Sequence, residues 1–197
     1  MKRIILALGF SIAFISITKA QEIPDRERRW LIGVSLTPIF QGIPAAGAPT
    51  IGTQIKYAFG KHAIRLYTSY SNHASEKDTS FIDNATGFVF APGYQYTVED
   101  GKFKFFFGGD IYIEALSTIN KNGGIYAKTE TGHTGIKFFM GASYQLSARL
   151  SISAELGKLI AGETKKLYAS EKGTPTELKG SYSNFVGGQI LMLNYHF

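Results

Sequence analysis

Eight charged side chains stand within stretches of alternating apolar and polar residues, and they are the first candidates for chemistry in this sequence. Charges of both signs that share the inside of a folded sheet must pair, because an unpaired charge away from water is costly. The set therefore predicts an internal network of ion pairs and hydrogen bonds with a structural role, rather than a conducting or catalytic one. Its members are Lys56, Arg65, Lys104, Asp110, Glu114, Lys137, Arg149 and Glu155.

A second candidate is the single His-x-Ser sequence, in which Glu76 follows His73 and Ser75. These are the residue types of a nucleophile, a base and an orienting acid. They lie in a polar stretch, 71–80, that is predicted to be a flexible loop. A flexible loop does not hold a nucleophile, a base and an acid in a fixed arrangement. The other three histidines, His62, His133 and His196, have no metal-ligand spacing. We therefore expect no catalytic residues, no metal site and no cofactor.

Strict alternation with a period of two identifies the elements that would position these residues, and it recurs along most of the chain. Glycine and aromatic residues are abundant, as in β proteins: 22 Gly, 11 Tyr and 15 Phe. The pattern predicts an all-β fold of about eight strands. The expected strands span 30–37, 51–59, 64–70, 88–96, 103–114, 136–145, 149–156 and 191–197.

The connections between these strands are expected to alternate in length. Those after the second, fourth and sixth strands span a few residues, whereas the others are long: 41–50, 72–85, 116–132 and 161–180. Short turns at one end and long loops at the other are typical of outer-membrane barrels, whose long loops lie outside the cell. Two residues disturb the alternation. Pro92 predicts a bulge with Gly93, and Gln189 falls on the apolar face unless a bulge at Gly187-Gly188 shifts the register.

The two faces of the expected strands differ, since one is continuously apolar and the other carries the eight charges. A soluble barrel would place the apolar face inside, as a lipocalin-type ligand carrier does, and that alternative stays open. Six aromatic residues favour a membrane barrel, because they mark the same end of their strands as an interfacial girdle would. They are Trp30, Phe59, Tyr96, Phe103, Tyr144 and Phe197. The prediction is a closed antiparallel up-and-down transmembrane β-barrel over residues 30–197.

The amino terminus has the features of an export signal. Lys2 and Arg3 precede an apolar run over 4–17, and small residues before Gln21 predict cleavage after Ala20. The mature chain would then have 177 residues, with a short periplasmic segment at 21–29. Three basic residues lie in the signal, so the net charge falls from +6 to +3, which is too small to indicate a nucleic-acid partner. With no cysteine, neither disulfides nor thiolate metal sites are expected.

The last residues resemble the carboxyl-terminal signature of bacterial outer-membrane barrels, in which alternate apolar residues end in phenylalanine. Here they are Leu191, Leu193, Tyr195 and Phe197. With the alternation before them, the chain resembles the small eight-stranded OmpA/OmpX-type barrels, without the periplasmic domain of OmpA. The resemblance implies that Tyr195 and Phe197 form an assembly signal for the barrel-assembly machinery. It also implies outer-membrane lipid as surroundings.

Some barrels of this size modify lipid A, and the deacylase kind carries a His-x-Ser pair on a strand near the carboxyl terminus. The pair at His73 and Ser75 lies elsewhere in the chain, so an enzyme is the least favoured interpretation. We expect a structural or surface-interaction barrel with a side-chain-filled lumen, whose long loops meet an extracellular partner. A small pore or hydrophobic-ligand transporter is the alternative.

Overall fold

The structure, a computed structural model, describes residues 30–36, 50–78, 81–122, 125–170 and 173–197. The expected signal peptide and the segment 21–29 lie outside the described residues. Eight antiparallel strands, each paired with its neighbours in sequence order, form a closed barrel in which β1 also pairs with β8. The strands are β1 (Trp30–Ser35), β2 (Thr50–Phe59), β3 (His62–Asp78), β4 (Phe81–Asp100), β5 (Phe103–Asn122), β6 (Ile125–Gln145), β7 (Leu150–Tyr168) and β8 (Thr176–His196).

The predicted fold class is confirmed, and the alternation gave the correct faces of the predicted strands, with the exception of Arg149 at the start of the seventh. Apolar residues project outward around the barrel and remain exposed, whereas the charged and small residues between them turn into the lumen. We call the outward set the apolar belt; it includes Ile32, Ile55, Ile64, Phe90, Phe105, Ile111, Phe138, Met140, Leu156 and Ile160. Within the described part of the chain, no helix has the length and apolar character needed to cross a membrane.

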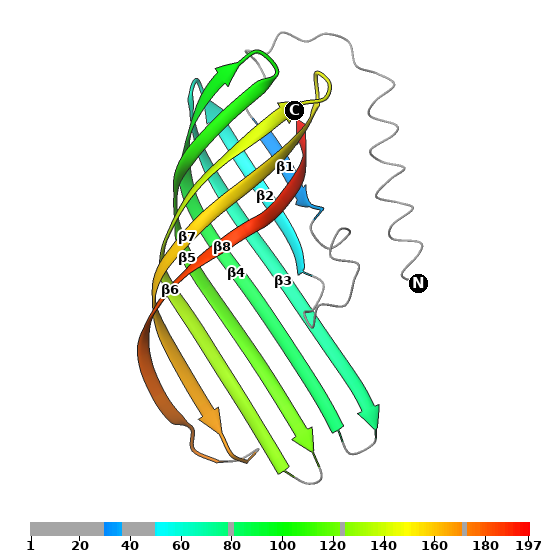
Figure 1. Cartoon of the computed structure of the whole chain (residues 1–197), viewed down its shortest axis with the longest axis vertical. Helices are drawn as coiled ribbons and strands as arrows, with labels where there is room; N and C mark the ends of the chain where they lie inside the picture. Colours follow the sequence, from blue (N-terminus) through cyan, green and yellow to red (C-terminus); the bar gives the residue numbers. More distant parts are fainter. Residues whose placement is uncertain (1–29, 37–49, 79–80, 123–124, 171–172) are drawn as a thin grey trace.

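The two ends of the barrel differ in construction (Figure 1). The short connections β2–β3, β4–β5 and β6–β7 lie at the upper end with the carboxyl terminus. Gly60 and Gly101 make two of these turns with positive φ angles of 68° and 61°, a conformation that glycine adopts without steric cost. At the lower end, β3 to β8 continue well beyond β1 and β2 (Figure 1).

At this lower end, the prediction of long loops after the third, fifth and seventh strands is wrong. Residues 72–78, 81–85, 116–122, 125–132, 161–168 and 176–180 are paired strand, and β5 and β6 stay in register out to Asn122 opposite Ile125. These segments are rich in Thr, Ser, Lys, Glu and Asn, so they lack the apolar face from which the other strands were recognised. The predicted loop over 41–50 lies outside the described residues except at Thr50, which begins β2.

The predicted bulge at Pro92-Gly93 is absent. The β3–β4 register runs without a shift through Leu66–Pro92 and Arg65–Gly93, and the β4–β5 register is the same on either side of the proline. Pairing with β5 is only interrupted at 91–92, which accommodates the missing N–H. The other expected bulge occurs, since 187–189 of β8 stand opposite Leu156 alone. The side chain of Gln189 lies outside the described residues.

Candidate functional site in the barrel lumen

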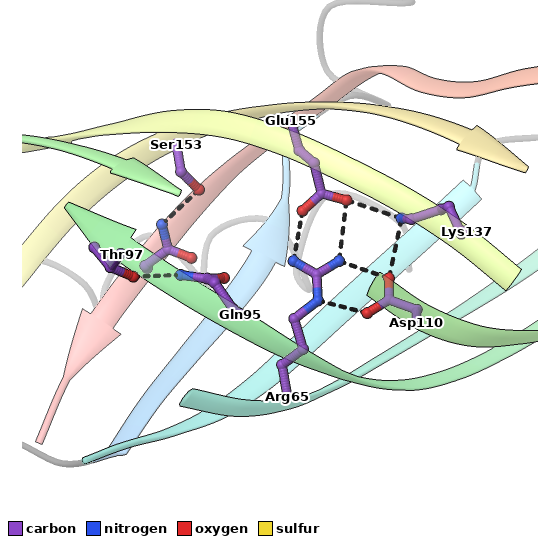
Figure 2. A network of polar contacts seen from close by, with 8 residues as sticks. Arg65, Gln95, Thr97, Asp110, Lys137, Ser153 and Glu155 are labelled. Atoms are coloured by element: carbon purple, nitrogen blue, oxygen red, sulfur yellow. Dashed lines mark hydrogen bonds and ion pairs between the residues drawn. The ribbon is translucent and has the colours of Figure 1, made fainter. Parts of the chain in front are cut away.

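The centre of the lumen is occupied by four charged side chains from four strands, which we call the charge cluster: Arg65 of β3, Asp110 of β5, Lys137 of β6 and Glu155 of β7. Each is 6 % exposed or less. Figure 2 shows them turned toward one another across the barrel. Strand alternation places each of them inward, because at least one of its two sequence neighbours is an outward apolar residue: Ile64, Ile111, Ile136 and Leu156.

Arg65 is bound by two carboxylates at once. Its Nε and Nη2 donate to the two oxygens of Asp110, both at 2.8 Å, and its Nη1 and Nη2 donate to Glu155 at 2.6 and 3.0 Å. Lys137 Nζ completes the cluster, 2.8 Å from Glu155 Oε1 and 3.4 Å from Asp110 Oδ2. Two positive and two negative charges thus compensate each other, which makes the burial of all four tolerable.

An aromatic ring supports the cluster from one side. The Arg65 guanidinium carbon lies 3.5 Å from the centre of the Phe139 ring, and Phe139 contacts Phe106, with ring centres 6.4 Å apart. Arginine stacks well on such faces because its guanidinium is planar and weakly hydrated. Lys56 lies next to this layer, with Nζ 4.8 Å from the centre of the Phe106 ring. Among the described residues, no ion pair includes Lys56.

Three of the eight predicted network residues make other contacts instead. Lys104 pairs with Glu99 near the short-turn end, at 2.9 Å, and Glu114 pairs with His133, at 2.8 Å. Arg149 lies in the β6–β7 connection rather than in a strand, and its Nη1 donates to the Tyr195 hydroxyl at 3.2 Å. Tyr195 faces outward, so the expectation that Arg149 faces the lumen is wrong.

Two further layers fill the lumen on the long-hairpin side of the charge cluster. The first is apolar and buried, and consists of Tyr67, Val89, Ala91, Tyr112, Leu159 and Ala161, with Tyr182 packed against it. Beyond it His133 lies between two carboxylates, with Nδ1 2.8 Å from Glu114 and Nε2 3.3 Å from Glu163. The His133 ring also packs on Tyr182, with ring centres 4.3 Å apart. These layers close the lumen on that side of the cluster.

Sequence reasoning missed the inward aromatics and the His133 cluster. Phe106 and Phe139 lie inside runs of consecutive aromatics, 105–107 and 138–139, where alternation is hidden. His133 falls between the predicted loop 116–132 and the predicted strand 136–145, but it lies in β6 directly opposite Glu114 and Glu163. The signal that could have found it is the continuation of the alternation through the polar residues of β5 to β7.

The His-x-Ser residues are not in a loop. His73, Ser75 and Glu76 belong to β3, where they pair with Ala85, Asp83 and Ile82 of β4, and their side chains lie outside the described residues. In the described portion of the chain, no group of three or more His, Cys, Asp or Glu residues is arranged to hold a metal ion.

Aromatic residues encircle the short-turn end on the outer surface. All six predicted girdle residues have an aromatic neighbour there: Trp30 contacts Tyr57, Phe59 and Tyr96 contact His62, Phe103 and Tyr144 contact each other, and Phe197 contacts Tyr195. The ring centres in these pairs lie between 4.8 and 5.9 Å apart. Together they border the apolar belt at one edge.

Comparisons with known proteins match the fold of the chain and no sequence family. No protein-family model and no curated protein sequence matches the chain. Among solved structures, it is similar to a major outer membrane protein from Thermus thermophilus, with a TM-score of 0.55 and 11 % sequence identity over 87 % of this chain and 100 % of that one. A second match is the ferric yersiniabactin uptake receptor FyuA from Yersinia pestis, with a TM-score of 0.33 and 12 % identity over 85 % of this chain and 32 % of the receptor.

Proposed function

We propose that this chain is a bacterial outer-membrane β-barrel that acts by contact at the cell surface, in a structural or surface-interaction role, and that it is neither an enzyme nor a wide pore. The outer-membrane location is supported by the distribution of side chains, which is the reverse of that in a soluble barrel. An apolar belt bordered by aromatics faces outward, and the charges face inward, which suits a lipid surrounding and would be costly in water. The barrel fold shared with an outer-membrane protein agrees with this location.

The observation that carries the contact role is the continuation of β3 to β8 beyond the apolar belt as polar β-hairpins. On β6 the belt ends at Ile136, whereas the strand begins at Ile125. About ten residues of tilted strand correspond to roughly 25 Å of wall outside the lipid. Such a wall presents a rigid polar surface to the environment, and a shorter barrel would span the membrane equally well.

The outward face of this wall carries charges of both signs. Lys128 Nζ lies 2.6 Å from Glu130 Oε1, and Tyr168 donates its hydroxyl hydrogen to Glu130 at 3.1 Å. The hydrogen bond from Lys128 lowers the pKa of Glu130. The filled lumen argues against bulk transport, because the charge cluster and the apolar layer leave no wide passage.

Shortening one hairpin tests the contact role. In the trimmed variant, residues 118–129 are replaced by an Asn-Gly turn, so that Ser117 and Glu130 remain paired strand ends. We expect this variant to fold into the outer membrane and to migrate faster unboiled than boiled, but not to restore the surface properties of a deletion strain. Full restoration by the trimmed barrel would contradict the contact role.

Planar-bilayer recording tests the closed lumen. Purified wild-type protein is expected to give no stable porin-sized conductance. Reproducible large steps from pure protein would favour the alternative, a small pore or hydrophobic-ligand transporter.

A further inference from the structure

The outer wall of the barrel has a groove at the edge of the apolar belt that lies toward the long hairpins. One row of paired residues crosses β3 to β7 there, and its members are Tyr70, Phe88, Ala115, Gly132 and Thr164. The two aromatic side chains stand out from the wall, about half exposed, whereas the three residues that follow are small. This step leaves a hollow of about 500 Å³, and a second hollow of about 330 Å³ adjoins it at Gly132 and Thr164. We call the two hollows together the outer groove.

The glycines of the outer groove are not required by backbone packing. A Cβ at Gly132 would come no closer than 3.8 Å to another part of the chain, and one at Gly162 no closer than 3.9 Å. At Gly135 and Gly141 of β6, by contrast, a Cβ would lie 2.1 and 2.3 Å from backbone oxygens. Glycine weakens a strand because it has no side chain to pack, so the fold alone does not explain the open space above Gly132 and Gly162. A ligand in the groove does.

Positive charge lies on the rim of the outer groove that faces away from the apolar belt. Lys166 lines the first hollow, two residues beyond Thr164 on β7, and Lys179 lines the second, directly opposite Thr164 on β8. Among the described residues no ion pair includes Lys166, and Lys179 has only an exposed contact with Glu177, at 3.4 Å. An exposed contact of this kind contributes little and is easily exchanged for another. Both ammonium groups can therefore bind an anion above Thr164.

The other polar groups of the groove leave this positive charge in place. The Glu130 carboxylate lines the first hollow, but it is already bound by Lys128 and by the Tyr168 hydroxyl. The hydroxyl groups of Thr86 and Ser117 line the same hollow. Because a hydroxyl both donates and accepts, these two residues can hydrogen-bond to a phosphate or to the hydroxyls of a sugar.

From this arrangement we propose that the outer groove binds a phosphorylated glycolipid of the outer leaflet. The phosphate accepts from the Lys166 and Lys179 ammonium groups, the sugar lies over the hydroxyl-lined floor, and an acyl chain runs onto the apolar belt at Ile136 and Ile160. A soluble anion would make no use of the aromatic wall, whereas a lipid at the membrane boundary meets the apolar and the positive surface at once. The proposal rests on the membrane location and orientation of the proposed function, which place this edge of the belt in the outer leaflet.

Native mass spectrometry of the folded full chain in detergent micelles counts the bound lipids and compares their affinities. Three probes separate the features of the ligand: diphosphorylated lipid A, the same lipid without its phosphates, and phosphatidylglycerol, which has a phosphate but no sugar. We expect diphosphorylated lipid A to bind at least about fivefold more tightly than either of the other two, because charge-assisted hydrogen bonds to the phosphate add to the contacts of the sugar. Inorganic phosphate should not displace it, since free phosphate makes no contact with the apolar side of the groove.

Lys166→Met tests the phosphate contact. It should weaken diphosphorylated lipid A by about fivefold or more and leave the lipid without phosphates unchanged. Lys121→Met is the matched control, because it removes the same charge from the outward face of β5, outside the groove. The control should change the binding of neither lipid.

Gly132→Leu tests the groove itself. A side chain at this position has room and would fill the hollow, so both forms of lipid A should bind more weakly. Gly109→Leu places the same side chain on the apolar belt outside the groove, where a Cβ would meet nothing closer than 3.7 Å. This control should bind both lipids like the wild type.

The proposal is overturned if the three probes bind equally, if phosphatidylglycerol binds best, or if Lys166→Met and Gly132→Leu bind diphosphorylated lipid A like the wild type. Heat-modifiable migration on gels checks that each variant is folded. Should Lys166→Met fail to fold, the comparison of Gly132→Leu with Gly109→Leu decides by itself. The trimmed variant keeps Ser117 and Glu130 and should bind the lipid like the wild type, so failure of the lipid site and failure of the contact role are distinct outcomes.

Discussion

Gly93 and Asp110 face each other across the β4–β5 ladder, and the Asp110 carboxylate occupies the space in which a side chain at Gly93 would lie. A Cβ at this position would collide with Asp110 Oδ1 and approach the backbone oxygen of Gly109 to 2.5 Å. The glycine is therefore required for Asp110 to reach Arg65.

A first prediction follows for Gly93→Ala, which should destabilise the barrel by about 1–3 kcal/mol through overpacking against backbone. Reversible denaturant unfolding in lipid bilayers measures the loss. Gly109→Ala is the control on the neighbouring strand, because its Cβ would meet nothing closer than 3.7 Å. Equal losses in the two variants would mean that the space beside Asp110 is not restrictive.

The second prediction concerns Arg65, which holds both carboxylates of the charge cluster. Arg65→Met leaves Asp110 and Glu155 with Lys137 alone, and breaking such a buried set costs about 3–5 kcal/mol. The same unfolding measurement tests it. Adding Glu155→Gln to Arg65→Met restores charge balance, so the double variant should be more stable than Arg65→Met. A double variant that is less stable would show that charge compensation is not what holds the cluster.

A third prediction tests the membrane location by depth along one strand. Met140 and Thr134 both face outward on β6, Met140 within the apolar belt and Thr134 beyond its last residue, Ile136. Arginine near the centre of the bilayer costs about 2–4 kcal/mol, and near the interface about 0–1 kcal/mol. Met140→Arg should therefore reduce stability in bilayers far more than Thr134→Arg. Equal effects would contradict a lipid-facing belt.

Orientation in the membrane gives a fourth prediction. The chain has no cysteine, so single cysteines can be introduced without background. A cysteine at Thr174, in the β7–β8 connection, should react with an impermeant reagent on intact cells, whereas one at Lys61 or Lys102 should react only after the cells are broken. The reverse pattern would invert the proposed orientation and place the outer groove in the periplasmic leaflet.

Much of this fold could be predicted from the sequence because one physical rule dominates it. Along each strand that crosses the apolar belt, lipid-facing and lumen-facing residues alternate. The apolar residues Ile64 and Leu66 on either side of Arg65 are therefore enough to predict that they face outward and that Arg65 faces the lumen. The rule loses its signal where both faces are polar, as between Ser117 and Thr134. Those residues still form paired strands, because hairpin pairing continues from the belt without needing an apolar face.

The composition of the charge cluster could not be read from single strands. Alternation shows that Lys104, Asp110 and Glu114 all point inward from β5, but only the stagger between strands decides which of them lies level with Arg65. Glu114 is two inward positions further along than Asp110 and meets His133 instead. Stagger is a property of the closed ring, and no local pattern in the sequence encodes it.

The contact between Arg65 and Glu155 joins strands that are not neighbours in the sheet, since β3 and β7 are separated by three others. It can form only when the sheet has already curled, and it then holds the two sides at the distance required for a ring. The pairing of β1 with β8, which covers only Leu31–Ser35, joins the first and last strands and completes the ring. Bringing such distant segments together is the slow, entropically expensive part of folding a β-structure. In the finished ring the buried ion pair therefore fixes the distance between opposite walls, and it supports a closure that the short β1–β8 pairing alone would hold weakly.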